Sequence, residues 1–294
     1  MRQAAALTLV AMLVAAGCGG DDASPEPSSP SPKVEDPGPI HVHGLGVNPK
    51  DGALFIATHT GLFRAPEGAQ TAKRVADRYQ DTMGFTVVGP DRFLGSGHPD
   101  AREGLPPFLG LIRSTDAGRN WDEVSLMGKS DFHVLEASGD RVYGFGTNYE
   151  TGQAEFLVSD DGGERWDQRT APGPLISLAI SPGDRDLIVG AAEDGLYRSA
   201  DAGRTWRPLS DDTGLLAWAQ TDVLALVDVA GEVATSGDQG QSWQAVGTVS
   251  GEPAAFEAAG DDLYAALHDG TIKQSTDGGK GWTVRSTPQA TATE

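Results

Sequence analysis

The octapeptide STDAGRNW at residues 114–121 decides the fold of this chain, because its pattern S-x-D-x-G-x-x-W returns four more times. The further copies occupy residues 159–166, 199–206, 236–243 and 275–282, so that successive serines are 45, 40, 37 and 39 residues apart. Periods of about 40 residues are typical of the four-stranded blades of a β-propeller. The repeat therefore predicts an all-β propeller.

Each copy of the motif has the residues of a tight hairpin turn. The Asp carboxylate can accept backbone N–H groups across the turn, and the Gly supplies a positive φ. The Ser hydroxyl is expected to hold the start of the turn, and the Trp is expected to pack inward. We expect each copy to join the third and fourth strands of a blade.

The other strands can be predicted around the copy at residues 199–206. Residues 175–181 alternate as an inner strand, and residues 186–191 form the apolar run of a strand covered on both faces. Third and fourth strands follow at residues 195–199 and 205–209. Aligned to this blade, residues 41–49, 53–59 and 61–65 form a first blade that lacks the motif, and residues 83–88, 92–97 and 109–114 open the second.

The predicted fold is a six-bladed propeller with four-stranded antiparallel blades, spanning residues 40–288. The closure of the ring stays open at this point. The first and last blades could each be complete, or residues 38–41 could donate a strand to the last blade.

Composition narrows the classes of partner. The chain has 294 residues, with 22 Lys and Arg against 42 Asp and Glu, which gives a formal net charge of -20. Such a surface disfavours nucleic acid and direct docking on anionic lipid headgroups. Metal cations, glycans and other small ligands remain candidates, and we expect a monomer.

The N-terminus has the order of a secretory signal. Arg2 precedes an apolar run at residues 4–16, which ends in Ala15-Ala16-Gly17-Cys18 and resembles a bacterial lipobox. We predict a lipoprotein signal peptide at residues 1–17, acylation of Cys18, a disordered Ser/Pro-rich tether at 18–39 and a disordered tail at 289–294. This places the protein on the outer face of the bacterial cytoplasmic membrane. In the alternative, the signal peptide is an ordinary one and Cys18 is incidental.

The five motifs resemble the Asp-box, or BNR, repeats of sialidases and related propellers. With HVHGL at residues 41–45, DTMGF at 81–85, GHP at 97–99 and DFH at 131–133, the chain is similar to a bacterial lipoprotein family whose members are commonly named glycosyl hydrolases. The resemblance implies the propeller fold for the whole folded body. It leaves open whether the protein is an enzyme and, if so, a glycoside hydrolase.

The blade alignment gathers all six histidines on one rim. The starts of inner strands and the ends of second strands share the rim opposite the motif turns. The residues at inner-strand starts are His41, His43, Met83 and His133. The residues at second-strand ends are His59, His98, Glu193 and His268.

This histidine-rich rim predicts a transition-metal site in the central funnel. Imidazoles with a thioether and no thiolate suit zinc or copper, since Cys18, the single cysteine, lies outside the folded body. His41, His43 and His133 are the predicted principal donors, completed or shielded by Met83, His59 and His98. The same side chains could instead bind an organic ligand by hydrogen bonds. Further contacts for such a ligand would be Asp81, Arg102, Glu193 and His268.

Two other functions stay open. A sialidase needs three converging arginines, but Arg64, Arg113 and Arg198 share one third-strand slot that predicts a framework role, which leaves Arg78 and Arg102. A glycosidase needs only two opposed carboxylates. Candidates near the funnel are Asp81, Asp100, Asp131, Glu136, Glu193 and Asp269. A non-catalytic module that binds a protein or glycan through residues 146–156 is the third possibility.

Overall fold

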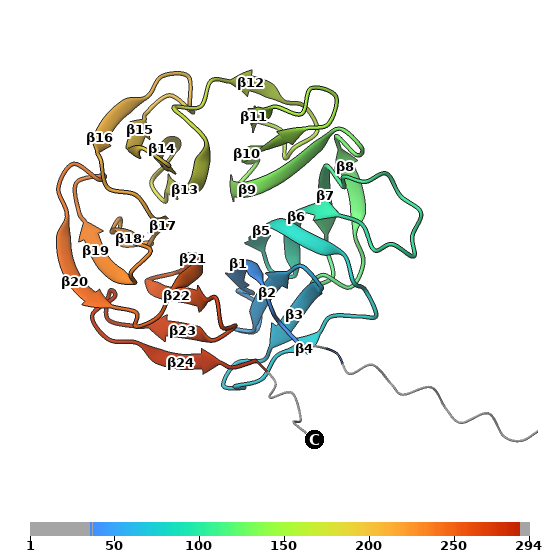
Figure 1. Ribbon diagram of the computed structural model, residues 1–294, viewed down its shortest axis with the longest axis horizontal. Helices are drawn as coiled ribbons and strands as arrows, with labels where there is room; N and C mark the ends of the chain where they lie inside the picture. Colours follow the sequence, from blue (N-terminus) through green and yellow to red (C-terminus); the bar gives the residue numbers. More distant parts are fainter. Residues whose placement is uncertain (1–35, 37, 289–294) are drawn as a thin grey trace, which may run out of the picture. The chain divides into compact units, whose positions relative to one another are not determined.

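Six four-stranded sheets account for the strands in residues 36 and 38–288, the part of the chain that the computed structural model describes (Figure 1). Each sheet pairs four consecutive strands in antiparallel order. The predicted all-β, six-bladed propeller is confirmed. The predicted signal peptide, the acylation site Cys18, most of the tether and the tail at 289–294 lie outside the described residues.

The strands follow one another blade by blade. Blade 1 holds β1 (Val42–Val47), β2 (Leu54–Thr58), β3 (Gly61–Ala65) and β4 (Lys73–Arg74). Blade 2 holds β5 (Asp81–Gly89), β6 (Arg92–His98), β7 (Leu111–Ser114) and β8 (Asp122–Ser125). Blade 3 holds β9 (Ser130–Ser138), β10 (Arg141–Asn148), β11 (Ala154–Ser159) and β12 (Asp167–Arg169).

The second half of the ring has the same order. Blade 4 holds β13 (Leu175–Ser181), β14 (Asp184–Ala192), β15 (Gly195–Ser199) and β16 (Arg207–Ser210). Blade 5 holds β17 (Leu215–Trp218), β18 (Leu224–Val227), β19 (Glu232–Ser236) and β20 (Gln244–Thr248). Blade 6 holds β21 (Pro253–Ala259), β22 (Asp262–Leu267), β23 (Ile272–Ser275) and β24 (Thr283–Ser286). No helix among the described residues has the length and hydropathy that crossing a membrane requires.

The motif turns have the hydrogen bonds that their residue types predict. In blade 4 the Ser199 hydroxyl accepts the Gly203 amide proton at 2.8 Å and donates to Asp201 Oδ1 at 2.7 Å. Asp201 Oδ1 also accepts the Thr205 amide at 2.9 Å. Gly203 has a φ of 77°, and a Cβ there would lie 2.5 Å from the Phe156 ring of blade 3. Both the backbone conformation and the packing therefore require glycine at this position.

Neighbouring blades bury apolar side chains against each other. Between blades 3 and 4, Tyr143 and Phe156 pack against Leu178 and Ile188, and the half-buried Trp206 covers the edge of this cluster. A similar cluster lies between every pair of neighbours, and in five of the six junctions it includes the motif Trp of the later blade. The inward packing predicted for the tryptophans is confirmed, although each keeps part of its surface exposed.

The ring closes without exchange of a strand. Blades 1 and 6 are each built from one continuous stretch of chain. Leu45 and Phe63 of blade 1 pack against Ala266 and Ile272 of blade 6. The Arg285 guanidinium reinforces this junction by donating to the carbonyl of Ala69 at 2.7 Å. The sequence left open whether the first and last blades are each complete or share a strand. In the structure each of them is complete.

The repeated third-strand arginines contact other parts of the framework. Arg113 Nη2 donates to the Gly162 carbonyl in the motif turn of blade 3, and Arg198 donates to Gln239 in that of blade 5. Arg64 forms an ion pair with Asp51 in its own blade at 2.6 Å. These contacts agree with the predicted framework role and remove the three side chains from the funnel.

The motif turn can be tested in blade 4. Asp201→Ala leaves the Thr205 amide and the Ser199 hydroxyl without their acceptor, so we expect the free energy of unfolding to fall by about 1–2 kcal/mol. Urea denaturation followed by tryptophan fluorescence measures it. Asp212→Ala, at an exposed position two residues beyond β16, is the matched control. Equal stability of both variants would contradict the structural role of the motif carboxylate.

Candidate metal centre

A shared irregularity in five of the six inner strands places one residue of each at the central channel. The inner strands β1, β5, β9, β13, β17 and β21 surround the ring's centre (Figure 1). In five of them the pairing register shifts at the same slot, and a bulge redirects the side chain found there. The residues at this slot are His43, Met83, His133, Ile176 and Ala254. All five line one cavity of about 90 Å³.

Asp81 is the centre of the group that these strands bring together. It is the first residue of β5, directly opposite His98 at the end of β6. Its Oδ2 lies 2.7 Å from His59 Nδ1 and 3.4 Å from His98 Nδ1. Its Oδ1 lies 3.6 Å from His43 Nε2. One carboxylate thus faces three imidazoles from two blades, and the ligand atoms of His43, His59 and Asp81 all lie within 4.8 Å of one another.

Asp131 of blade 3 extends the group. Its Oδ2 lies 3.1 Å from His133 Nε2 and 3.6 Å from His98 Nε2. His98 therefore lies between the two carboxylates, with one ring nitrogen toward each. The ring of His41 lies beside that of His59, with 5.5 Å between centroids. We refer to these seven residues as the histidine cluster: His41, His43, His59, Asp81, His98, Asp131 and His133.

The cluster holds buried polar atoms that have no hydrogen-bond partner among the described residues. They are His43 Nε2, Asp81 Oδ1 and Asp131 Oδ1. Burial of such atoms costs free energy unless another group satisfies them. Most polar atoms in a folded interior have partners, so three orphans in one cluster make it the candidate functional site.

Two imidazoles of the cluster have opposite shifts in pKa. Burial, followed by the nearby His59, lowers the pKa of His43 to about 4, so this ring is neutral at physiological pH. The hydrogen bond to Asp131 raises the pKa of His133. A neutral imidazole is the form that binds metal ions, and His43 has this form without competition from protons near pH 7.

The structure brings together only some of the residues predicted from the sequence. His41, His43, His59, His98 and His133 meet, and Met83 lines the same cavity as His43 and His133. His268 and Glu193 are exposed just beyond β22 and β14, in blades 6 and 4. Among the described residues, neither forms a hydrogen bond, ion pair or ring contact with the cluster.

The two arginines considered for the funnel are engaged elsewhere. Arg102 forms ion pairs with Asp100 at 2.6 Å and Asp77 at 3.2 Å, and Arg78 forms one with Glu103 at 2.8 Å. Because each already has a carboxylate partner, neither is arranged to receive an anionic sugar.

Sequence reasoning underrated the two aspartates. It placed Asp81 among contacts to an organic ligand, and it named Asp131 only as one of many carboxylates. A positional signal was present: His41, Asp81 and Asp131 each precede a bulge-slot residue by two positions. Residues two apart on a strand point to the same side, so Asp81 and Asp131 could have been grouped with His41 and the other histidines.

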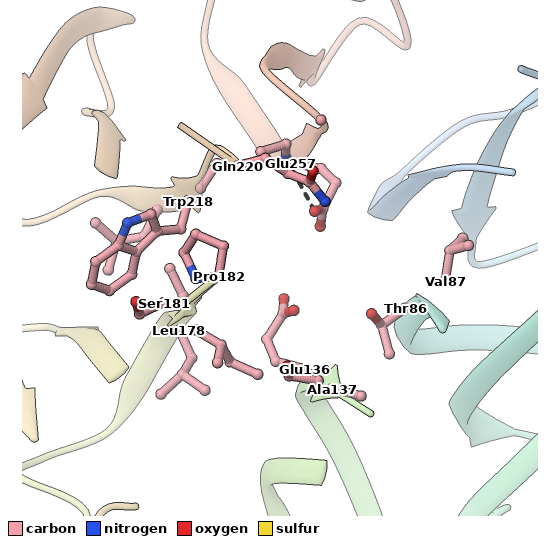
Figure 2. A pocket seen from close by; sticks show the side chains of 17 residues that line it. Thr86, Val87, Glu136, Ala137, Leu178, Ser181, Pro182, Trp218, Gln220 and Glu257 are labelled. Atoms are coloured by element: carbon pink, nitrogen blue, oxygen red, sulfur yellow. Dashed lines mark hydrogen bonds between the residues drawn. The ribbon is translucent and has the colours of Figure 1, made fainter. Parts of the chain in front are cut away.

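A second pair of carboxylates lies deeper in the channel. Figure 2 shows Glu136 of β9 and Glu257 of β21 pointing into a cavity of about 270 Å³ from opposite sides. Both also line the cavity of the bulge-slot residues. Burial raises the pKa of Glu257 to about 7, and burial together with the charge of Glu257 raises that of Glu136 well above its usual range. The pair therefore retains protons at a pH where ordinary carboxyl groups have lost them.

Comparison with known proteins supports the fold more than any activity. No family model matches the chain. It is 28% identical to dispase autolysis-inducing protein of Streptomyces mobaraensis over 160 residues, which are 54% of this chain and 38% of that protein. The chain thus matches well under half the length of this curated relative.

Solved structures share the propeller at low sequence identity. A gluconolactonase from Xanthomonas campestris superposes with a TM-score of 0.61 at 13% identity, over 78% of this chain and 84% of its own. YCF48 bound to D1 peptide gives a TM-score of 0.53 at 16% identity, over 85% and 83%. At these identities the likeness establishes the fold alone.

The Glu136–Glu257 pair predicts an unusual pH dependence of stability. In the unfolded chain each carboxyl titrates near its ordinary value, whereas the folded protein keeps the proton to higher pH. The folded state therefore binds more protons between about pH 4.5 and 7, and its stability falls as the pH rises through this window.

We expect Glu257→Gln to weaken this dependence, since Glu136 keeps the part that its own burial causes, and to raise the free energy of unfolding above pH 7 by roughly 1–3 kcal/mol. Urea midpoints at pH 5, 6, 7 and 8 measure the effect, with the exposed Glu252→Gln as the control. Parallel pH profiles for wild type and Glu257→Gln would refute it.

Proposed function

We propose that this protein binds a transition-metal ion, zinc or copper, at His43, His59 and Asp81. The observation that carries the proposal is the pair of orphan atoms His43 Nε2 and Asp81 Oδ1, which face each other at 3.6 Å. This separation is too long for a hydrogen bond. Zn–N and Zn–O bonds of about 2.0–2.2 Å at tetrahedral angles place two ligand atoms about 3.3–3.5 Å apart. An ion between the two atoms would satisfy both.

The chemistry of the surrounding donors supports a late first-row ion. Imidazole nitrogens dominate the group, and the one carboxylate supplies negative charge. The ring of His59 lies 4.3 Å from that of His43 between centroids, and the ligand atoms of both lie within 4.8 Å of each other and of Asp81. Met83 shares the cavity of His43, and a thioether there would favour Cu(I) over zinc.

The proposal includes location at the cell envelope. The apolar run at residues 4–16 followed by Cys18 supports secretion and lipid anchoring, as in the bacterial lipoproteins that the chain resembles. On the outer face of the membrane the site would bind metal ions from outside the cytoplasm.

Metal titration of the full chain tests the site. After removal of bound metal with a chelator, we expect Zn(II) or Cu(II) to bind, and His43→Ala or Asp81→Ala to weaken binding at least about tenfold, since either removes a ligand. Isothermal titration calorimetry measures the affinity. His268→Ala, an exposed histidine in blade 6, should bind as wild type does. Equal affinity of the His43 and His268 variants would disprove the site.

A glycoside hydrolase is a second candidate, because one specific feature favours it. Glu136 and Glu257 face each other across a cavity, and their raised pKa values leave a proton for donation at neutral pH. A proton donor opposite a second carboxylate is the minimal equipment for hydrolysis of a glycosidic bond.

A screen of neutral and acidic chromogenic glycosides decides this candidate. It predicts turnover without added metal that falls at least about 100-fold in Glu136→Gln, because the general acid or base is lost. The exposed Glu193→Gln should keep wild-type activity. Absence of turnover across the panel would remove the candidate.

A further inference from the structure

We propose that a basic pocket beside the outer strands of blade 1 binds the phosphate group of a small soluble ligand. The pocket has a volume of about 460 Å³, and none of the described residues that line it is acidic. Its four basic lining residues are Arg64 of β3, Lys73 and Arg74 of β4, and Arg119 in the motif turn of blade 2. No lining residue belongs to the histidine cluster, so the pocket is separate from the proposed metal site.

The charge of this pocket differs from what the composition favours. Acidic residues outnumber basic ones by 42 to 22 in the chain. The cavity at the corresponding junction between blades 2 and 3 also has about 460 Å³, and Arg113 takes the third-strand slot of Arg64 there. The motif position of Arg119, however, is Glu164 at that junction, and Asp161 also lines the wall. The junction between blades 1 and 2 is thus positive where the next one is mixed.

Two cations of the pocket have no carboxylate partner among the described residues. Lys73 is exposed and forms neither a hydrogen bond nor an ion pair there. Arg119 is exposed as well and donates from Nη1 only to the carbonyl of Asp116, at 2.9 Å. Arg64 shares its charge with Asp51 in the ion pair at 2.6 Å. The positive charge available to a ligand therefore comes in particular from Lys73 and Arg119.

Arg74 gives the pocket a wall that is already ordered. Its guanidinium lies over the rings of Tyr79 and Phe63, at 3.9 and 4.5 Å from their centroids, and donates to the carbonyl of Thr60. A side chain held in this way loses little freedom when a ligand binds. Val75 is one of the small apolar side chains that complete the wall. Apolar walls with a few polar groups and a volume of this size are typical of small-molecule sites.

The donors fit a phosphate better than a carboxylate. A phosphate monoester has a charge of about −1.5 to −2 at pH 7 and three acceptor oxygens, whereas a carboxylate has one charge and two oxygens. The planar guanidinium of Arg119 can donate two bonds to phosphate oxygens, and the ammonium of Lys73 can approach the third as a point charge. Because the net charge of -20 disfavours an anionic lipid surface, we expect the phosphate to belong to a soluble molecule.

Isothermal titration calorimetry with glycerol phosphate tests the pocket. The full chain is first stripped of metal with a chelator and separated from it by gel filtration, so that no bound metal attracts the phosphate. We expect binding that weakens at least about tenfold in Lys73→Ala and in Arg119→Ala, because each removes a charge-assisted hydrogen bond. Both side chains are exposed, so the variants should keep the fold, which urea denaturation checks.

Arg204→Ala is the matched control. Arg204 holds the motif position of Arg119 in blade 4 and donates to the carbonyl of Asp201 at 3.0 Å, but it does not line the pocket. Its variant should bind as wild type does. No binding by the wild type, or an equal loss of affinity in Arg204→Ala, would overturn the proposal.

Two further measurements test the kind of ligand. Acetate that binds as tightly as glycerol phosphate would overturn the assignment of a phosphate group. Sedimentation with phosphatidylglycerol vesicles distinguishes a lipid headgroup from a soluble ester. Vesicle binding that is lost in Lys73→Ala, in a protein that does not bind glycerol phosphate, would overturn the proposal in favour of a lipid surface.

Discussion

The ring holds together because every blade buries one face against the blade before it and the other against the blade after it. Six apolar clusters, one at each junction, provide this burial. The motif turns secure the outer strands, and their glycines let the turn of one blade approach the side chains of the previous one. Packing of this kind fixes the rotation between neighbours, and the rotation decides which inner-strand residues can meet at the centre.

The candidate site depends on that rotation and on the bulges of the inner strands. Blades 1 to 3 carry His43, Met83 and His133 at the bulge slot, whereas blades 4 and 6 carry Ile176 and Ala254 there. At this slot, therefore, blades 1 to 3 supply side chains with nitrogen or sulfur atoms, and blades 4 and 6 supply apolar ones. Orphan atoms such as Asp131 Oδ1 cost free energy in the folded protein, because they are buried without a hydrogen-bond partner among the described residues. The net charge of -20 adds a field that draws cations toward the surface.

The sequence predicted the architecture closely because its five motifs are local and regular. Residues 175–181 and 195–199 were predicted as strands with the bounds that β13 and β15 have. The common placement of His43, Met83 and His133 also followed from the alignment of blades. The central position of Asp81 did not follow from the alignment, because it depends on side-chain distances between blades. With 42 acidic residues in the chain, the sequence also offered no reason to single out Asp81 and Asp131. Glu136 and Glu257 belong to blades 3 and 6, and only the closed ring places them in one cavity.

Because the ring closes without strand exchange, each of the six blades is one continuous segment of the chain, and all six have the same strand order. Every four-stranded sheet lies within one continuous stretch of chain. The seam between blades 6 and 1 differs from the other junctions in its missing motif tryptophan and in an isolated parallel bridge between Thr71 and Thr287. New termini opened in any interblade loop, with the old ends joined, would break no ladder. The gene could thus be circularly permuted blade by blade, and the histidine cluster of blades 1 to 3 could be moved to the middle of the chain without redesign of a single sheet.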